Sequence, residues 1–141
     1  MYKPRHIVSM IFAAMLVASP AFAGDASKNM KSVMQQLTKD MQTLFGHIMK
    51  DEFEEIEKYA EKVANHDEPP VTHRLRIIGS LGTSFPAFKA HDDNVHINAM
   101  ALKKAASERN IEGVLSHYAK VTSSCNDCHK EYRKQIQELN L

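Results

Sequence analysis

Apolar residues recur along the chain at alternating steps of three and four, which is the period of an amphipathic helix. Four segments show this pattern: residues 27–50, residues 52–66, a segment that opens at Ser84, and residues 111–139. No segment shows sustained alternation of apolar and polar residues with β-branched enrichment, the pattern typical of strands. The sequence therefore predicts an all-α fold, an antiparallel up-down-up-down four-helix bundle.

The predicted buried stripe is clearest in the first and last segments. In the first segment it consists of Met30, Met34, Leu37, Met41, Leu44 and Ile48. In the last segment it consists of Ile111, Val114, Tyr118, Val121, Cys125, Cys128 and Tyr132. Core packing accounts for most of these positions, but the last stripe also contains both cysteines of the chain.

Prolines and glycines mark the expected breaks between helices. Pro69 and Pro70 lack backbone donors and disfavour helical geometry just before them, so the second helix should end near His66. Residues 67–84 are then expected to be a long connection, with at most a short helical turn around residues 74–78. The Ser84 hydroxyl is predicted to cap the third helix, with Pro86 in its first turn.

The N-terminal residues have the pattern of a secretory signal peptide. Lys3 and Arg5 precede an apolar stretch from residue 7 to residue 18, which is too short to cross a bilayer as a helix of about 20 residues. Residues 21–23 read Ala-Phe-Ala, a small-x-small cleavage pattern. We expect residues 1–23 to be removed, leaving a periplasmic protein of residues 24–141 without a membrane span.

Residues 24–141 are enough for one domain with one core. Loss of Lys3 and Arg5 leaves 16 basic and 17 acidic residues, with no basic cluster that would indicate nucleic acid binding. The chain has no tryptophan, so a core of side chains alone would be lean and a buried cofactor could add apolar mass. No constellation of acid, base and nucleophile indicates an enzyme.

The stretch "SSCNDCHKEYR", residues 123–133, carries the distinctive chemistry. A redox dithiol of the thioredoxin type is expected near a βαβ unit, which this chain lacks. A disulfide between Cys125 and Cys128 would close too short a loop to contribute much stability. Structural zinc would need further ligands from elsewhere, because His129 follows Cys128 too closely to complete a compact tetrahedral site.

One interpretation uses all three residues together, because C-x-x-C-H is the attachment signature of c-type haem. Cys125 and Cys128 lie on one face of a helix, where each can form a thioether to a haem vinyl group. His129 can then bind the iron from the proximal side. The sequence predicts one haem c, covalently bound through Cys125 and Cys128.

The mature chain resembles the class II c-type cytochromes, meaning cytochrome c′ and its low-spin relatives. The specific landmark is "CNDCHKEYR" near the C-terminus, and looser ones are "MKSVMQQLTKDMQTLF", "HDEPP" and "FKAHDDNVH". The resemblance implies a four-helix bundle with the haem on the last helix. Arg133, one turn after His129, is expected to orient a propionate or the proximal side, and the alternative is a solvated surface arginine.

Two branches of this family differ in the sixth iron position. In the low-spin branch a methionine of the first helix binds the iron, giving an electron carrier, whereas in cytochrome c′ proper the site is open and binds nitric oxide or carbon monoxide. The last helix continues nine or ten residues past His129, so the antiparallel first helix should meet the haem near residue 36. Met34 is therefore the expected ligand. Alternatives are an open site, Met30, Met41 or His91.

The other histidines are not expected to bind iron. His117 lies 12 residues before His129, roughly 18 Å along the helix axis. Surface or loop positions are predicted for His47, His66, His73 and His96. We expect a periplasmic single-electron carrier that works with redox partner proteins, as a monomer or homodimer, and the alternative is a five-coordinate protein that binds small gases.

Overall fold

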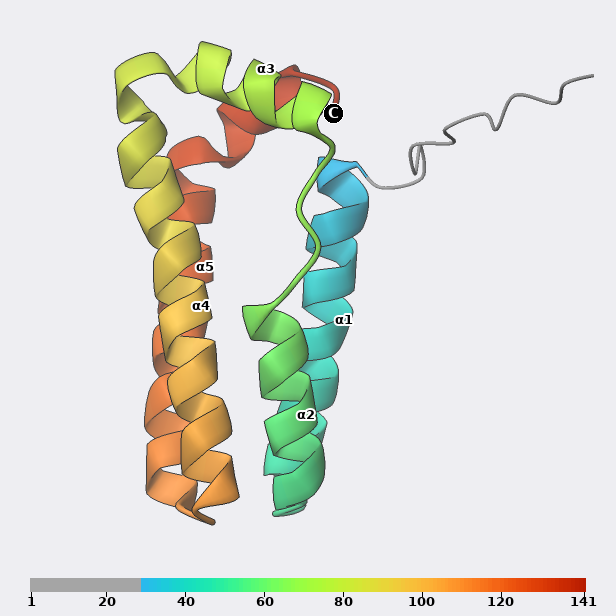
Figure 1. Cartoon of the computed structure of the whole chain (residues 1–141), viewed down its shortest axis with the longest axis vertical. Coiled ribbons are helices and arrows are strands. Elements are labelled where there is room, and N and C mark those ends of the chain that lie inside the picture. The colour runs from blue at the N-terminus through green and yellow to red at the C-terminus, as the bar shows by residue number, and fades with distance from the viewer. Residues whose placement is uncertain (1–28) are drawn as a thin grey trace, which may run out of the picture.

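The computed structural model describes residues 29–141, and all regular structure in that range is helical. The elements are α1 (Met30–Ile48), α2 (Phe53–Ala64), α3 (Val71–Leu81), a 3-10 turn (Gly82–Ser84), α4 (Phe85–Ser107) and α5 (Ile111–Glu138). Four of them, α1, α2, α4 and α5, run alternately up and down, and α3 crosses one end (Figure 1). The predicted all-α four-helix bundle is confirmed.

Two features predicted near the N-terminus, the signal peptide of residues 1–23 and the first two residues of the segment 27–50, lie outside the described residues. Within residues 29–141, none of the helices combines the length and the hydrophobicity needed to span a bilayer.

The helices pack in the order of the chain. α4 packs most closely against α5 and α2, and α1 packs against α2. In the described part of the chain, the backbones of α1 and α5 approach each other far less closely than these neighbouring pairs do. Among the neighbouring bundle helices in this part of the chain, α1 and α5 are therefore the pair with the most widely separated backbones.

One large group of buried side chains, here called the main core, holds the helices together. Its members, all less than 9% exposed, are Leu44, Ile48, Ile56, Ala60, Val63, Ala64, Val95, Ala99, Leu102, Ala105, Ala106, Val114 and Val121. Small residues predominate on α4, which lets α2 and α5 approach its backbone. The helical stripes read from the sequence thus predicted most of the packing surface.

The short second helix, α2, extends along only part of the bundle and does not reach the end covered by α3. α2 ends at Ala64, well before the end of the neighbouring α1, and residues 65–70 continue without helical structure beside α1 (Figure 1). Pro69 and Pro70 explain why the helix does not continue through this stretch. Between the end of α2 and the start of α3, the non-helical residues 65–70 therefore lie where a longer second helix would have continued.

The prediction that residues 67–84 form a connection with only a short turn was wrong, because residues 71–81 form the helix α3. Pro70 occupies the position before its first residue, where a missing donor costs nothing. Ile77 and Leu81 are buried beneath it, and Gly82, with φ of 53°, ends it. The prolines therefore separate two helices.

The predicted cap of the third bundle helix was also wrong. Ser84 has helical backbone angles and makes no side-chain capping bond, because the 3-10 turn leads directly into α4. Pro86 does lie in the first turn of α4, as predicted.

Candidate functional site

The apolar interior is divided into two parts. Besides the main core there is a second group at the end covered by α3, here called the end cluster, which consists of Ile77, Leu81, Tyr132 and Ile136. Cys125 packs against the main core, whereas Cys128, one turn later on α5, packs against the end cluster. The C-x-x-C pair therefore spans the boundary between the two groups.

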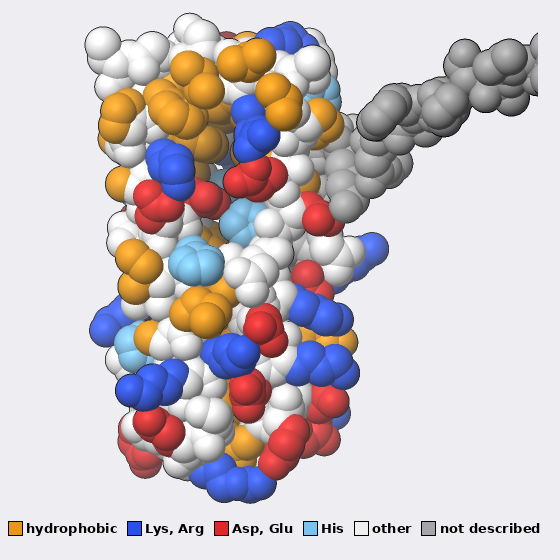
Figure 2. All heavy atoms as spheres, in the orientation of Figure 1, with side chains coloured by type: hydrophobic (Ala, Val, Ile, Leu, Met, Phe, Trp, Pro, Cys, Tyr) orange, Lys and Arg blue, Asp and Glu red, His pale blue; other side chains and the backbone are white. Residues whose placement is uncertain are grey.

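The boundary between the main core and the end cluster lies at corresponding positions on α4 and α1. On α4, Phe88 packs against the end cluster and Val95 belongs to the main core. On α1, Met30 packs against the end cluster and Leu37 against the main core. At this level Figure 2 shows the surface hollowed, with acidic, basic and histidine side chains around the hollow. The interior is thus interrupted next to the cysteines.

Both cysteines are free, half-buried thiols. Burial raises the pKa of the Cys125 thiol. Burial also raises the pKa of the Cys128 thiol to about 11, and Cys125 and the charges of Asp92 and Glu131 add smaller increases. A redox dithiol needs the opposite, a thiol whose pKa is lowered. No group of three His, Cys, Asp or Glu residues suited to a metal ion occurs within residues 29–141, so the zinc interpretation lacks ligands there.

His129 follows Cys128 on α5 and is also half-buried. Burial lowers the pKa of its imidazole, and the neighbouring positive charge of Arg133 lowers it further. The neutral ring, which has a free nitrogen lone pair to offer a metal, is favoured by both effects. Arg133 itself is exposed, one turn beyond His129.

The methionines of α1 are distributed around the same level. Met30, Met34 and Met41 are all half-buried, and Met34 lies between Met30 at the end cluster and Leu37 at the main core. Met34 therefore lies at the level of the interruption.

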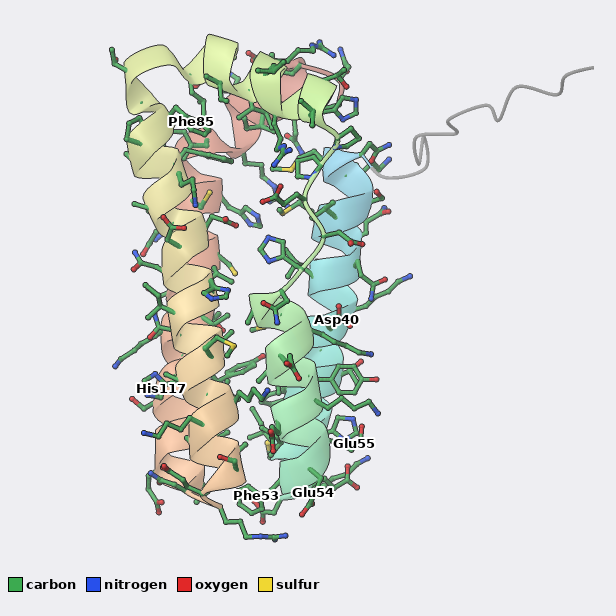
Figure 3. The ribbon with its side chains drawn as sticks, viewed as in Figure 1. Asp40, Phe53, Glu54, Glu55, Phe85 and His117 are labelled. Atoms are coloured by element: carbon green, nitrogen blue, oxygen red, sulfur yellow. The ribbon has the colours of Figure 1, made fainter. Side chains whose placement is uncertain are left out.

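A cavity of about 170 Å³ lies between this part of α1 and the end of α2. It is lined by Val33, Gln36, Leu37, Asp40, Lys62, Asn65, His66 and Asp67. Asp40 is 7% exposed and accepts hydrogen bonds from the amide of Gln36 at 3.2 Å (Figure 3). Sequence reasoning missed Asp40, although it lies seven residues after Val33 on one face of the helix.

Several histidines lie away from the interruption or are engaged elsewhere. His117 is in the half of the bundle far from Phe85 and lies 3.4 Å from the Asn98 side chain (Figure 3). His47 pairs with Glu52 and stacks on Tyr59. Both are therefore engaged with residues away from the interruption, and His47, expected at a surface or loop position, is half-buried on α1.

The remaining histidines are closer to the site. His91 lies on α4 with Nε2 3.6 Å from a carboxylate oxygen of Glu131 on α5. His96 Nδ1 lies 2.9 Å from the carbonyl oxygen of Ala64. His66, expected at the surface, is instead a half-buried link between residues 65–70 and α4, because its Nε2 lies 3.2 Å from Oδ1 of Asp92.

Several features of residues 29–141 suit the binding of a flat, partly polar group. The buried Nδ1 of His73 and the buried hydroxyl of Tyr132 have no hydrogen-bond partner within residues 29–141. The division of the core and the paired thiols lie in the same half of the bundle, and the backbones of α1 and α5 are widely separated. These residues fit a covalently attached haem.

Comparison with known protein families bears on this fit. The family model for Cytochrome C' matches residues 81–133, a segment that contains the whole of α4 and the whole C-x-x-C-H motif on α5. The match supports a class II c-type cytochrome. No curated protein and no solved structure matches the chain.

The matched segment does not include α1. The similarity to this family therefore concerns α4 and the part of α5 that carries the C-x-x-C-H motif.

Proposed function

We propose that this protein is a periplasmic monohaem c-type cytochrome that carries single electrons between redox partner proteins. One haem c is held by thioethers to Cys125 and Cys128, with His129 as the proximal ligand and Met34 as the sixth. The bound haem supplies the redox-active iron, and the protein sets its potential through ligands and burial. Arg133 orients the proximal side or a propionate.

The observation that carries this proposal is the position of the interruption in the apolar interior. Cys125 and Cys128 pack on opposite sides of it from α5, and Met34 lies at the same level on α1. A group attached through those cysteines would extend into the space between the two helices. Its faces would then meet His129 from one helix and α1 from the other.

The environment of His129 suits a proximal ligand. Its lowered pKa favours the neutral form, so little free energy is spent on removing a proton before the metal binds. The high pKa of Cys128 agrees with thiols that serve as attachment points and do not cycle as a dithiol.

The expected periplasmic location rests on the signal peptide pattern of residues 1–23. We propose redox proteins as partners, with neither nucleic acid nor an organic substrate. The protein acts as a monomer or homodimer.

The alternative function, binding of nitric oxide or carbon monoxide, requires that Met34 only packs beside an open site. Met34→Ala tests this. If Met34 binds the iron, the ferric wild-type protein should be low-spin, with the weak far-red absorption band of a methionine-iron bond. The variant should lose this band, show a lower reduction potential and bind carbon monoxide rapidly.

Met41→Ala is the matched control, because Met41 is equally half-buried on the same helix, two turns further along. It should leave the spectrum essentially unchanged, as should Met30→Ala. A wild-type protein that is high-spin and takes up carbon monoxide readily would contradict ligation by Met34 and favour the gas-binding function.

A further inference from the structure

The ring of His66 faces a hydrogen-bond acceptor at each nitrogen. Nδ1 lies 3.1 Å from the carbonyl oxygen of Val63, and Nε2 lies 3.2 Å from Oδ1 of Asp92. A neutral imidazole has only one N–H, whereas a protonated one donates from both nitrogens. Since a carbonyl and an ionised carboxylate can only accept, this arrangement is fully satisfied only when His66 carries a proton.

The surroundings of His66 favour its charged form over its neutral form. The hydrogen bond to Asp92 raises the pKa of His66 more than burial lowers it, and the carbonyl of Val63 adds to the rise. The same hydrogen bond lowers the pKa of Asp92. The His66 side chain is 17% exposed and that of Asp92 is 52% exposed, so the imidazole is the more shielded partner.

The pair lies near the haem-attachment residues. Asp92 is on α4 between Phe88 and Val95, where the apolar interior is interrupted. Its negative charge raises the pKa values of both Cys125 and Cys128, so it is within electrostatic reach of the two thiols.

His66 also lines the cavity beside α1. A volume of about 170 Å³ has room for about five water molecules at roughly 30 Å³ each. Its polar lining, including Gln36 and Asn65, can bind such water. A proton can therefore pass between His66 and bulk solvent without unfolding of the bundle.

Other charged and titratable groups surround the pair. Those that line the same cavity or act on His66 or Asp92 are Asp40 on α1, Lys62 on α2, Asp67 and Glu68 on the connection, and Lys89 and His96 on α4. Lys89 is in turn paired with Asp93. Among them His96 is the other imidazole, so it serves as the control.

We infer that His66 couples electron transfer to proton binding, so that the reduced protein holds the His66 proton more tightly than the oxidised protein does. This inference rests on the proposed function. On reduction one electron arrives from a redox partner, and the negative charge it adds near Asp92 favours the imidazolium. His66 then takes a proton from solvent, and both leave again on oxidation.

The coupling has a definite sign. Below the pKa of His66 in the oxidised protein the positive charge is present in both oxidation states, and the reduction potential is independent of this group. As pH rises past that value, the oxidised protein loses the His66 proton while the reduced protein still holds it. The reduction potential therefore falls. A tenfold difference in proton affinity between the two states corresponds to a total fall of 59 mV for one electron.

The test is a potentiometric titration of the haem-loaded protein from about pH 5 to 9, the range in which histidines titrate. The wild-type potential should fall with pH, and His66→Gln should remove most of this fall. His96→Gln should keep it, because the His96 ring bonds the backbone carbonyl of Ala64, whereas Asp92 pairs with His66. An unchanged slope in His66→Gln would overturn the inference.

A second measurement needs no variant. The ring resonances of His66, assigned by isotope-edited NMR in the wild-type protein, should give a higher titration midpoint in the reduced state than in the oxidised state. Equal His66 titration midpoints in the two oxidation states would refute the coupling. The proposed cytochrome function would still stand if the protein carried covalent haem with the expected spectrum. A protein without covalent haem would instead refute the proposed function itself.

Discussion

At the scale of single residues, burial and local pairing give chemically similar side chains different properties. Burial raises the pKa of Cys128 and lowers that of His129, which keeps the thiol protonated and the imidazole neutral. His66, by contrast, has its pKa raised by a carboxylate. One histidine is thus suited to bind a metal and the other to hold a proton.

The ion pair of His66 and Asp92 should make folding stability depend on pH in two directions. The raised pKa of His66 adds stability that is complete below its ordinary value of 6.5 and is lost as pH rises through the folded value. The lowered pKa of Asp92 adds stability that is complete above its ordinary value of 3.8 and is lost on acidification. The pair should therefore contribute most between these two values.

A double-mutant cycle with His66→Gln and Asp92→Asn measures this contribution. The coupling free energy from denaturant unfolding should be favourable at about pH 5.5 and smaller at about pH 9, because rising pH favours the neutral imidazole. A coupling of the same size at both pH values would show that the contact does not depend on the His66 proton.

The sequence indicates the proposed haem-binding residues more directly than it indicates this pair. Cys125, Cys128 and His129 lie within five consecutive residues, so their spacing alone defines a motif. His66 and Asp92 are 26 positions apart on different elements, and nothing in the local sequence of either residue indicates the other. Such a pair depends on how residues 65–70 lie against α4.

At the scale of elements, periodicity predicted the four bundle helices because each buries one stripe against its neighbours. It missed α3, since the only buried apolar residues there are Ile77 and Leu81, while Val71, Leu75 and Ile78 are exposed. The apolar residues of this helix therefore do not form a single inward-facing stripe. Two prolines before it and two glycines after residue 78 also suggested irregular structure.

The start of helix α5, on which the proposed haem attachment site lies, depends on a cap. The Asn110 side chain accepts a hydrogen bond from the backbone N–H of Gly113 at 3.0 Å. Asn110→Ala should lower the free energy of unfolding by about 1 kcal/mol, because one terminal donor loses its partner.

Denaturant unfolding of the haem-loaded protein checks this, with Ser116→Ala as the control. Ser116 is exposed on the same helix, so its change should stay within about 0.5 kcal/mol. If the two variants lose equal stability, the cap does not contribute as proposed.

At the scale of the whole molecule, the bundle combines a well-packed half with a half in which side chains leave the interior divided. We propose that the haem fills this division. Even a partly buried macrocycle removes on the order of several hundred Å² of apolar surface from water, worth several kcal/mol. This is a large share of a typical net stability of roughly 5–15 kcal/mol.

The haem-free protein should therefore be much less stable than the haem-loaded protein. The double variant Cys125→Ala, Cys128→Ala should show a clearly lower unfolding midpoint or accumulate poorly in cells that mature c-type cytochromes. Ser123→Ala, at an exposed position on the same helix, should behave as wild type. A double variant as stable as wild type would mean that side chains alone complete the core.

The central claim, covalent haem at the motif on α5, is tested most directly by mass spectrometry of tryptic peptides from protein produced with a c-type maturation system. Trypsin should release residues 121–130, which contain both cysteines and His129, and residues 110–120 of the same helix as an internal control. We predict that the first peptide carries the added mass of one haem and the second carries none. An unmodified first peptide with two free thiols would contradict the account.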